Sequence, residues 1–191
     1  MHPELERYRQ QFEQITNESA ELVKGLSEEE FNWRSNPGEW SVEECFAHLT
    51  MVGQVELDYI ERAIEDGRGR GLTGSGAFEL SMIERLVLRE TEPPVRHARS
   101  APKRFVPGHG HPQTAVMPTF FHVQRRFVLE IERADGLDLR RVKVVTPITR
   151  LLRLSLGATF AQAAAHERRH LAQARVIREK IPRGVPLPAT H

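Results

Sequence analysis

Two histidines near the C-terminal end of the chain have the spacing of metal ligands. His166 and His170 stand four residues apart in the segment HERRH. Residues four apart lie on one face of an α-helix, so both imidazoles can reach the same ion. Neutral imidazole binds zinc, nickel, iron and copper readily. The segment is therefore predicted to supply two ligands of a divalent metal site.

The same five residues also match the H-E-x-x-H pattern of zinc peptidases, in which the glutamate is the general base. That interpretation makes Glu167 catalytic and requires a further ligand downstream, where only Glu179 and His191 follow. The longer peptidase pattern has glycine and histidine where this chain has Gln173 and Val176. A peptidase is therefore the less favoured interpretation.

The elements that must position these side chains are amphipathic helices, because apolar residues recur every three or four positions. Long helices are predicted at residues 5–26, 41–67, 117–134 and 157–180, a shorter one at 77–89, and an extended segment at 142–148. Trp33 and Trp40 frame a turn before the second long helix and are expected to anchor the core there. The prediction is an all-α four-helix bundle, in which cofactor sites form between facing helices.

Both histidines of the HERRH segment face the interior of that bundle. Their stripe on the last helix continues through Ala163, Ala174 and Ile177, which are apolar. A lone inward histidine is usually a core residue hydrogen-bonded to backbone or carboxylate. Two on one helix favour a metal site, although a plain bundle with core histidines stays open as an alternative.

A third ligand is expected from the second long helix. His48 lies beside its apolar stripe, which includes Cys45 and Val52. Three neutral imidazoles would leave an ion its full charge and at least one open position, the arrangement of catalytic rather than closed structural zinc sites. Glu167 could then orient an imidazole or accept a proton, but the favoured interpretation is that it pairs with an arginine on the outer face.

The remaining histidines are weaker candidates. His97, His109 and His111 fall in a glycine- and proline-rich excursion at about residues 67–112, where they are expected to be solvated. The pair His109 and His111 could bind a metal weakly. His122 lies next to the stripe of the helix at 117–134, and could be a fourth ligand, a proton shuttle or, as we expect, an edge residue.

Composition limits the class of protein. The 191 residues are 39% hydrophobic and suggest one domain over residues 1–191. With 27 basic and 26 acidic side chains, the net charge of +1 makes nucleic acid an unfavourable partner. Cys45 is the only cysteine, which excludes an internal disulfide and suits a reducing cytoplasm. No apolar run approaches the ~20 residues that span a bilayer, so a cytoplasmic protein without a membrane partner is expected.

Two segments together resemble the DinB/YfiT-like superfamily of metalloenzymes. Residues 39–49 read EWSVEECFAHL and residues 166–173 read HERRHLAQ. The resemblance implies a four-helix bundle of up-down-down-up type, here with a long insertion between helices two and three. It also implies a metal, usually zinc or nickel, held by three histidines that correspond to His48, His166 and His170.

The resemblance further implies an enzyme acting on a small molecule. Relatives include thiol S-transferases that use bacillithiol or mycothiol and a mycothiol-dependent maleylpyruvate isomerase. A thiol-dependent S-transferase with a low-molecular-weight thiol cofactor is therefore the first expectation, and a metal-dependent hydrolase is the alternative. A non-catalytic, metal-stabilised dimerisation or sensor module is a third. Family analogy also suggests a homodimer.

Overall fold

Helices dominate the computed structural model of the protein, which describes residues 1–94, 101–146 and 152–182. The helices are α1 (Pro3–Val23), α2 (Glu28–Phe31), α3 (Val42–Gly69), α4 (Met82–Thr91), α5 (Gln113–Arg133) and α6 (Leu156–Lys180), with a 3-10 turn η1 (Lys103–Phe105). Two short antiparallel strands, β1 (Lys143–Val145) and β2 (Arg153–Ser155), form a small sheet. The predicted helical class is therefore confirmed, with the sheet as an addition.

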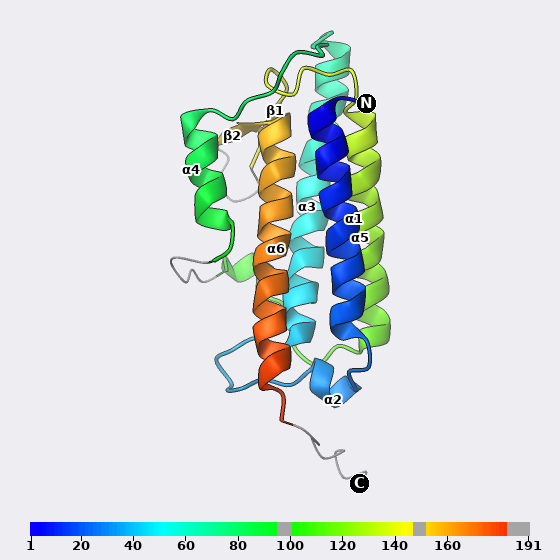
Figure 1. The fold of residues 1–191 in the computed structure, drawn as a ribbon, viewed down its shortest axis with the longest axis vertical. Coiled ribbons are helices and arrows are strands. Elements are labelled where there is room, and N and C mark those ends of the chain that lie inside the picture. The colour runs from blue at the N-terminus through cyan, green and yellow to red at the C-terminus, as the bar shows by residue number, and fades with distance from the viewer. Residues whose placement is uncertain (95–100, 147–151, 183–191) are drawn as a thin grey trace.

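The four long helices lie side by side (Figure 1). Helices α1 and α3 each pack against both α5 and α6. The backbone N–H of His2 donates to Asp135 at 2.9 Å, which places the start of α1 at the end of α5. Arg175 pairs with Glu18 and Tyr8 lies near Phe160, so α1 and α6 run in the same direction. The HERRH segment consequently sits midway along the bundle, facing α3.

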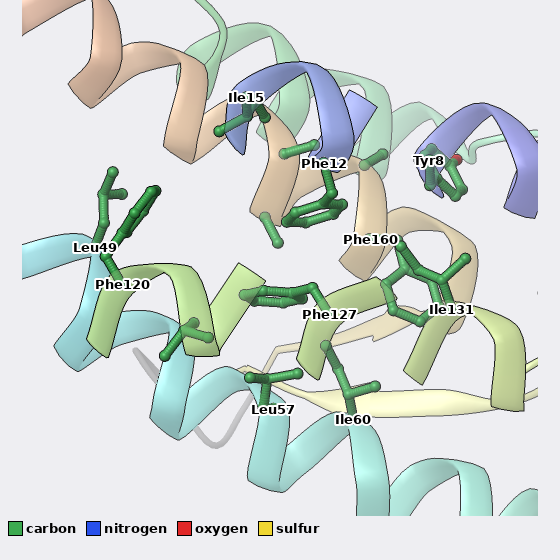
Figure 2. Close-up of a cluster of buried hydrophobic side chains, with 14 of the residues drawn as sticks. Tyr8, Phe12, Ile15, Leu49, Leu57, Ile60, Phe120, Phe127, Ile131 and Phe160 are labelled. Carbon is green, nitrogen blue, oxygen red and sulfur yellow. The ribbon is translucent and has the colours of Figure 1, made fainter. Parts of the chain in front are cut away.

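Aromatic and branched side chains fill the space between the long helices. Figure 2 shows Phe12 of α1 beside Phe127 of α5, with their ring centroids 4.6 Å apart. Gly53 lets α3 approach α5 closely, because a Cβ there would lie 2.7 Å from Val123 Cγ1. This packing fixes the position of α3, and so of His48, relative to the rest of the bundle.

The local signals of the sequence explain most helix boundaries. Capping boxes form at Ser27 and Ser41, where each hydroxyl accepts from the backbone three residues on. A third box, at Ser81, starts α4 later than the expected residue 77. Of the predicted extended segment at 142–148, residues 143–145 form β1, and 147–148 lie outside the described residues.

The excursion between α3 and α5 is packed onto the bundle at both ends. Helix α4 lies along α6 (Figure 1), and the Glu84 carboxylate accepts from the Ser155 backbone N–H at 2.8 Å. Further along, the side chain of Asn32 donates to the His111 carbonyl at 3.2 Å. The described parts of the excursion, up to residue 94 and from residue 101 on, therefore form a wall over one side of α3 and α6.

The outer faces of the long helices are charged. Arg9 pairs with Glu6 on α1 at 2.6 Å, and Arg133 pairs with Glu130 on α5 at 2.7 Å. In the part of the chain that the structure describes, no helix combines the length and apolar character needed to cross a membrane.

Candidate metal centre

The three predicted histidines come together between α3 and α6. His48 reaches from α3 to His166 and His170 of α6, and one ring nitrogen of each lies within 4.8 Å of the others. The Nε2 atoms of His48 and His166 are 3.4 Å apart. Two nitrogens bound to a tetrahedral zinc ion at 2.0–2.1 Å are about 3.3 Å apart. The spacing thus suits a shared ion.

Neighbouring groups fix which nitrogen faces the centre in two of the three rings. His48 Nδ1 lies 2.7 Å from the carbonyl oxygen of Phe105, and His170 Nδ1 lies 3.0 Å from Oε1 of Gln173. A proton on each Nδ1 donates to these oxygens and leaves the Nε2 lone pair free. Outer hydrogen bonds of this kind orient histidine ligands in metal sites.

The surroundings keep the imidazoles neutral, which is the form that binds metals. Burial lowers the pKa of His48 below its usual value. Burial, followed by the effect of neighbouring imidazoles, lowers the pKa of His166 to about 3 and that of His170 to about 2. No carboxylate belongs to this group of ligand atoms among the described residues. An ion bound here would keep its full positive charge.

A large cavity opens onto the three histidines. Its volume is about 1220 Å³, and its walls come from α3, α4, α6, the η1 segment and the small sheet. Trp40 stacks near the centre, with its ring 4.9 Å from that of His48 and 5.7 Å from that of His170. The cavity is large enough for a ligand much bigger than water. The arrangement can therefore offer an open coordination position to a small molecule.

Glu167 does not pair with an arginine on the outer face. Its side chain is buried, and Oε1 accepts from Gln124 Nε2 of α5 at 2.8 Å. Oε2 has no hydrogen-bond partner among the described residues. Burial raises the pKa of Glu167 to about 8, and nearby Glu56 adds to the rise. The carboxylate is outside the group of ligand atoms, so a catalytic role for Glu167 stays a prediction.

The downstream ligand that a zinc peptidase requires does not join the centre in the described chain. Glu179 is exposed and lines a separate hollow with Asn17 and Arg178. His191 lies outside the described residues. The third imidazole comes instead from His48, which is far upstream.

The other histidines of the described residues do not join the trio. His122 is exposed on α5, as expected of an edge residue, and His111 is also exposed. His109 Nδ1 lies 3.5 Å from Glu44 and 3.9 Å from Glu43. His97 lies outside the described residues.

Glu43, Glu44 and His109 form a second group of possible ligands, in which Glu44 is already paired with other side chains. Glu44 accepts from the Arg34 guanidinium, at 2.7 Å from Nε, and from the Ser41 backbone N–H at 2.9 Å. These donors occupy the Glu44 carboxylate, whereas both carboxyl oxygens of the buried Glu43 have no hydrogen-bond partner among the described residues. The cluster fastens the excursion to the start of α3.

Sequence reasoning missed three contributors to the site. Trp40 was predicted as a core anchor, yet it lies against two of the histidines. Gln173 follows His170 by three residues, a spacing that places both on one helix face and could have suggested the contact. Nothing in the sequence indicated Phe105, because its backbone carbonyl reaches His48 from 57 residues away.

Comparison with known proteins identifies the class. The model of the DinB superfamily matches residues 11–174, a range that includes all three histidines, and the chain belongs to this superfamily. The chain is also similar to the uncharacterised protein YuaE of Bacillus subtilis (strain 168). The two are 26% identical over 173 residues, which cover 90% of this chain and 98% of the relative.

Proposed function

We propose that this protein is a metal-dependent enzyme that acts on a small molecule at the three-histidine centre. The observation that carries the proposal is the position of the trio, whose ring nitrogens lie within 4.8 Å of one another beside a cavity of about 1220 Å³. A closed structural site would need no such space. Zinc or nickel is the proposed ion, because both accept neutral imidazoles.

The chemistry follows from neutral ligands and an open position. The bound ion would supply a positive charge that lowers the pKa of a coordinated thiol or water. The chain would supply orientation through Phe105 and Gln173, and an apolar wall that includes Trp40 and Leu154. Exclusion of water by such a wall strengthens electrostatic interactions inside the site.

We favour a thiol-dependent S-transferase with a low-molecular-weight thiol cofactor. The cavity has room for a thiol and a second substrate together. A metal-dependent hydrolase would use the same open position for water, and a non-catalytic dimerisation or sensor module would turn over neither substrate. The three alternatives differ in whether a thiol or water binds the ion, and in whether a reaction product forms.

Cobalt substitution tests the proposal. Thiols added to the cobalt-loaded protein should produce the near-ultraviolet charge-transfer band of a cobalt–thiolate bond, and should transfer to electrophilic acceptors only when metal is present. His166→Ala should abolish both signals, whereas His122→Ala, at an exposed histidine of α5, should keep them. Ester hydrolysis in the absence of a thiol would favour the metal-dependent hydrolase. If the protein neither transfers thiols nor hydrolyses esters, the proposal that it is an enzyme is contradicted.

The proposal also covers the domain organisation, the oligomeric state and the location of the protein. We propose a single domain over residues 1–191 with the up-down-down-up bundle of the DinB/YfiT-like type, and a homodimer that sedimentation would detect. Exposed Met82, Ile83 and Leu86 on α4 offer an apolar surface for self-association. The proposed location is the cytoplasm, where the buried free thiol of Cys45 would stay reduced.

A further inference from the structure

The cavity continues well beyond the three histidines. On α3 it is lined by His48, Val52 and then Glu56, and on α6 by His166 and then Gln162. Glu56 lies eight residues past His48, which is about 12 Å along the helix axis. Because α3 and α6 are antiparallel, Gln162 lies on the same side of the trio, about 6 Å from His166 along α6.

Glu56 is an unusual group to find in this wall. Only 6% of its surface is exposed, and no described residue gives its carboxyl a hydrogen bond or an ion pair. Burial raises the pKa of Glu56 to about 8. A buried carboxyl without a partner is costly, so its presence beside a ligand-sized cavity suggests a partner supplied from outside the chain.

A second polar group lies near it in an otherwise apolar region. The side-chain amide of Gln162 is half-buried, lines the cavity and has no hydrogen-bond partner among the described residues. Thr159, one turn further along α6, already donates its hydroxyl proton to the Ser155 carbonyl at 3.0 Å. Val52 and Val144 complete this part of the wall. Glu56 and Gln162, together with the half-buried Tyr59 hydroxyl farther along α3, are therefore the polar groups here that remain available to a ligand.

The charges around Glu56 favour a cation over an anion. The cations that line the cavity in the described chain are Arg169 and Lys180. Arg169 lies between His166 and His170 on α6 and Lys180 lies beyond them, so both are on the far side of His166 from Gln162. Glu56 also interacts with Glu167, a second buried carboxyl, and this interaction disfavours negative charge at this end.

We propose that Glu56 and Gln162 form a second binding position that takes an ammonium group of the substrate or cofactor, while the other end of that molecule reaches the metal centre. The proposal rests on the proposed function, because the metal anchors the far end. The ammonium would donate to the Glu56 carboxylate and to the Gln162 amide oxygen, which gives a charge-assisted hydrogen bond in a site shielded from water. The ligand class is an amine with a metal-binding group roughly 12 Å away at most.

Two probes that differ at one end test this assignment. Cobalt-loaded protein is titrated with 6-aminohexanethiol and with 6-hydroxyhexanethiol, calorimetry gives each affinity, and the thiolate absorption band reports ligation. The wild type should bind the amine at least tenfold more tightly. Glu56→Gln should remove that preference, and Gln162→Leu should reduce it severalfold. Glu65→Gln, at an exposed glutamate of the same helix, should leave it unchanged.

The outcomes distinguish ammonium binding at Glu56 and Gln162 from thiol binding at the metal centre. His166→Ala should weaken both probes and keep their ratio. Equal affinities in the wild type, or an unchanged ratio in folded Glu56→Gln, would overturn the ammonium position even if the thiolate band appears. A preference for the amine without any thiolate band would uphold the position and overturn the proposed thiol chemistry.

Discussion

At the scale of single residues, the metal centre depends on which nitrogen of each imidazole is free. Phe105 and Gln173 each accept from an Nδ1, so the Nε2 atoms of His48 and His170 are directed at a common point. Gln173 is exposed and lies in the third turn from the end of α6. A substitution of Gln173 therefore tests the orientation of the His170 ring with little effect on helix packing.

Gln173→Leu should weaken metal binding about 10- to 100-fold, since removing an outer hydrogen bond leaves the His170 ring free to turn. The free energy of unfolding without metal should change by no more than about 0.5 kcal/mol, as for most surface substitutions. Competition with a chromophoric chelator measures the affinity. Gln10→Leu, at an exposed glutamine of α1, is the control, and equal affinity in both variants would contradict the role of Gln173.

Glu56 makes stability depend on pH. Its pKa is about 8 in the folded protein and 4.5 ordinarily, so the folded state holds the proton more tightly. Below pH 4.5 the carboxyl is protonated in both states and does not lower the free energy of unfolding. As the pH rises from 4.5 toward 8, the folded protein loses stability. Glu56→Gln should raise the free energy of unfolding by a few kcal/mol at pH 8, on the order of 1.4 kcal/mol for each pKa unit.

Urea unfolding at pH 5 and at pH 8 measures this effect, with Glu65→Gln as the exposed control. The gain from Glu56→Gln should be much smaller at pH 5. A gain that is the same at both pH values would show that the carboxyl is not held neutral by burial.

The sequence predicted which histidines come together better than it predicted their surroundings. His166 and His170 share a helix face by spacing, and His48 was expected from its helix and the family resemblance. The favoured pairing of Glu167 with an arginine on the outer face was wrong, because a residue about 100° around the helix from a ligand can face a neighbouring helix as well as solvent. Only packing against α5 shows that it meets Gln124.

At the scale of elements, the close approach of α3 and α5 positions His48. Gly53→Ala would place a Cβ 2.7 Å from Val123 Cγ1 and 3.2 Å from Phe127 Cε2. The clash should cost about 1–3 kcal/mol of unfolding free energy. It should exceed the helix-propensity gain of about 1 kcal/mol.

Thermal unfolding measures the balance against Gly69→Ala in the same helix. Nothing lies within 4 Å of a Cβ at Gly69, so this variant should be neutral or more stable. If Gly53→Ala is as stable as Gly69→Ala, the two helices do not require a glycine to pack.

Long helices were predictable because their apolar stripes repeat over many turns, whereas shorter elements carry too few residues for a pattern. The strand β2 is only Arg153–Ser155 and shows no useful alternation. The start of α4 was misplaced because periodicity at residues 77–81 resembled helix, while the Ser81 hydroxyl caps the chain at that point. Local hydrogen bonding decided that boundary.

At the scale of the whole molecule, the excursion between α3 and α5 builds part of the site. Helix α4 lies along α6 (Figure 1), and the η1 segment brings the Phe105 carbonyl to within 2.7 Å of His48 Nδ1. The sequence left open whether this excursion covers the centre or only decorates the bundle. Its contacts bring together residues far apart in the chain, which composition and periodicity do not reveal.

The central claim is that three histidines from two helices hold one divalent ion. Its most direct test is the metal content, by elemental analysis, of protein purified without an affinity tag or chelator. Wild type and His122→Ala should contain about one ion per chain, and His48→Ala and His166→Ala should contain almost none. Absence of metal from the wild type after reloading, or full retention by both variants, would contradict the account.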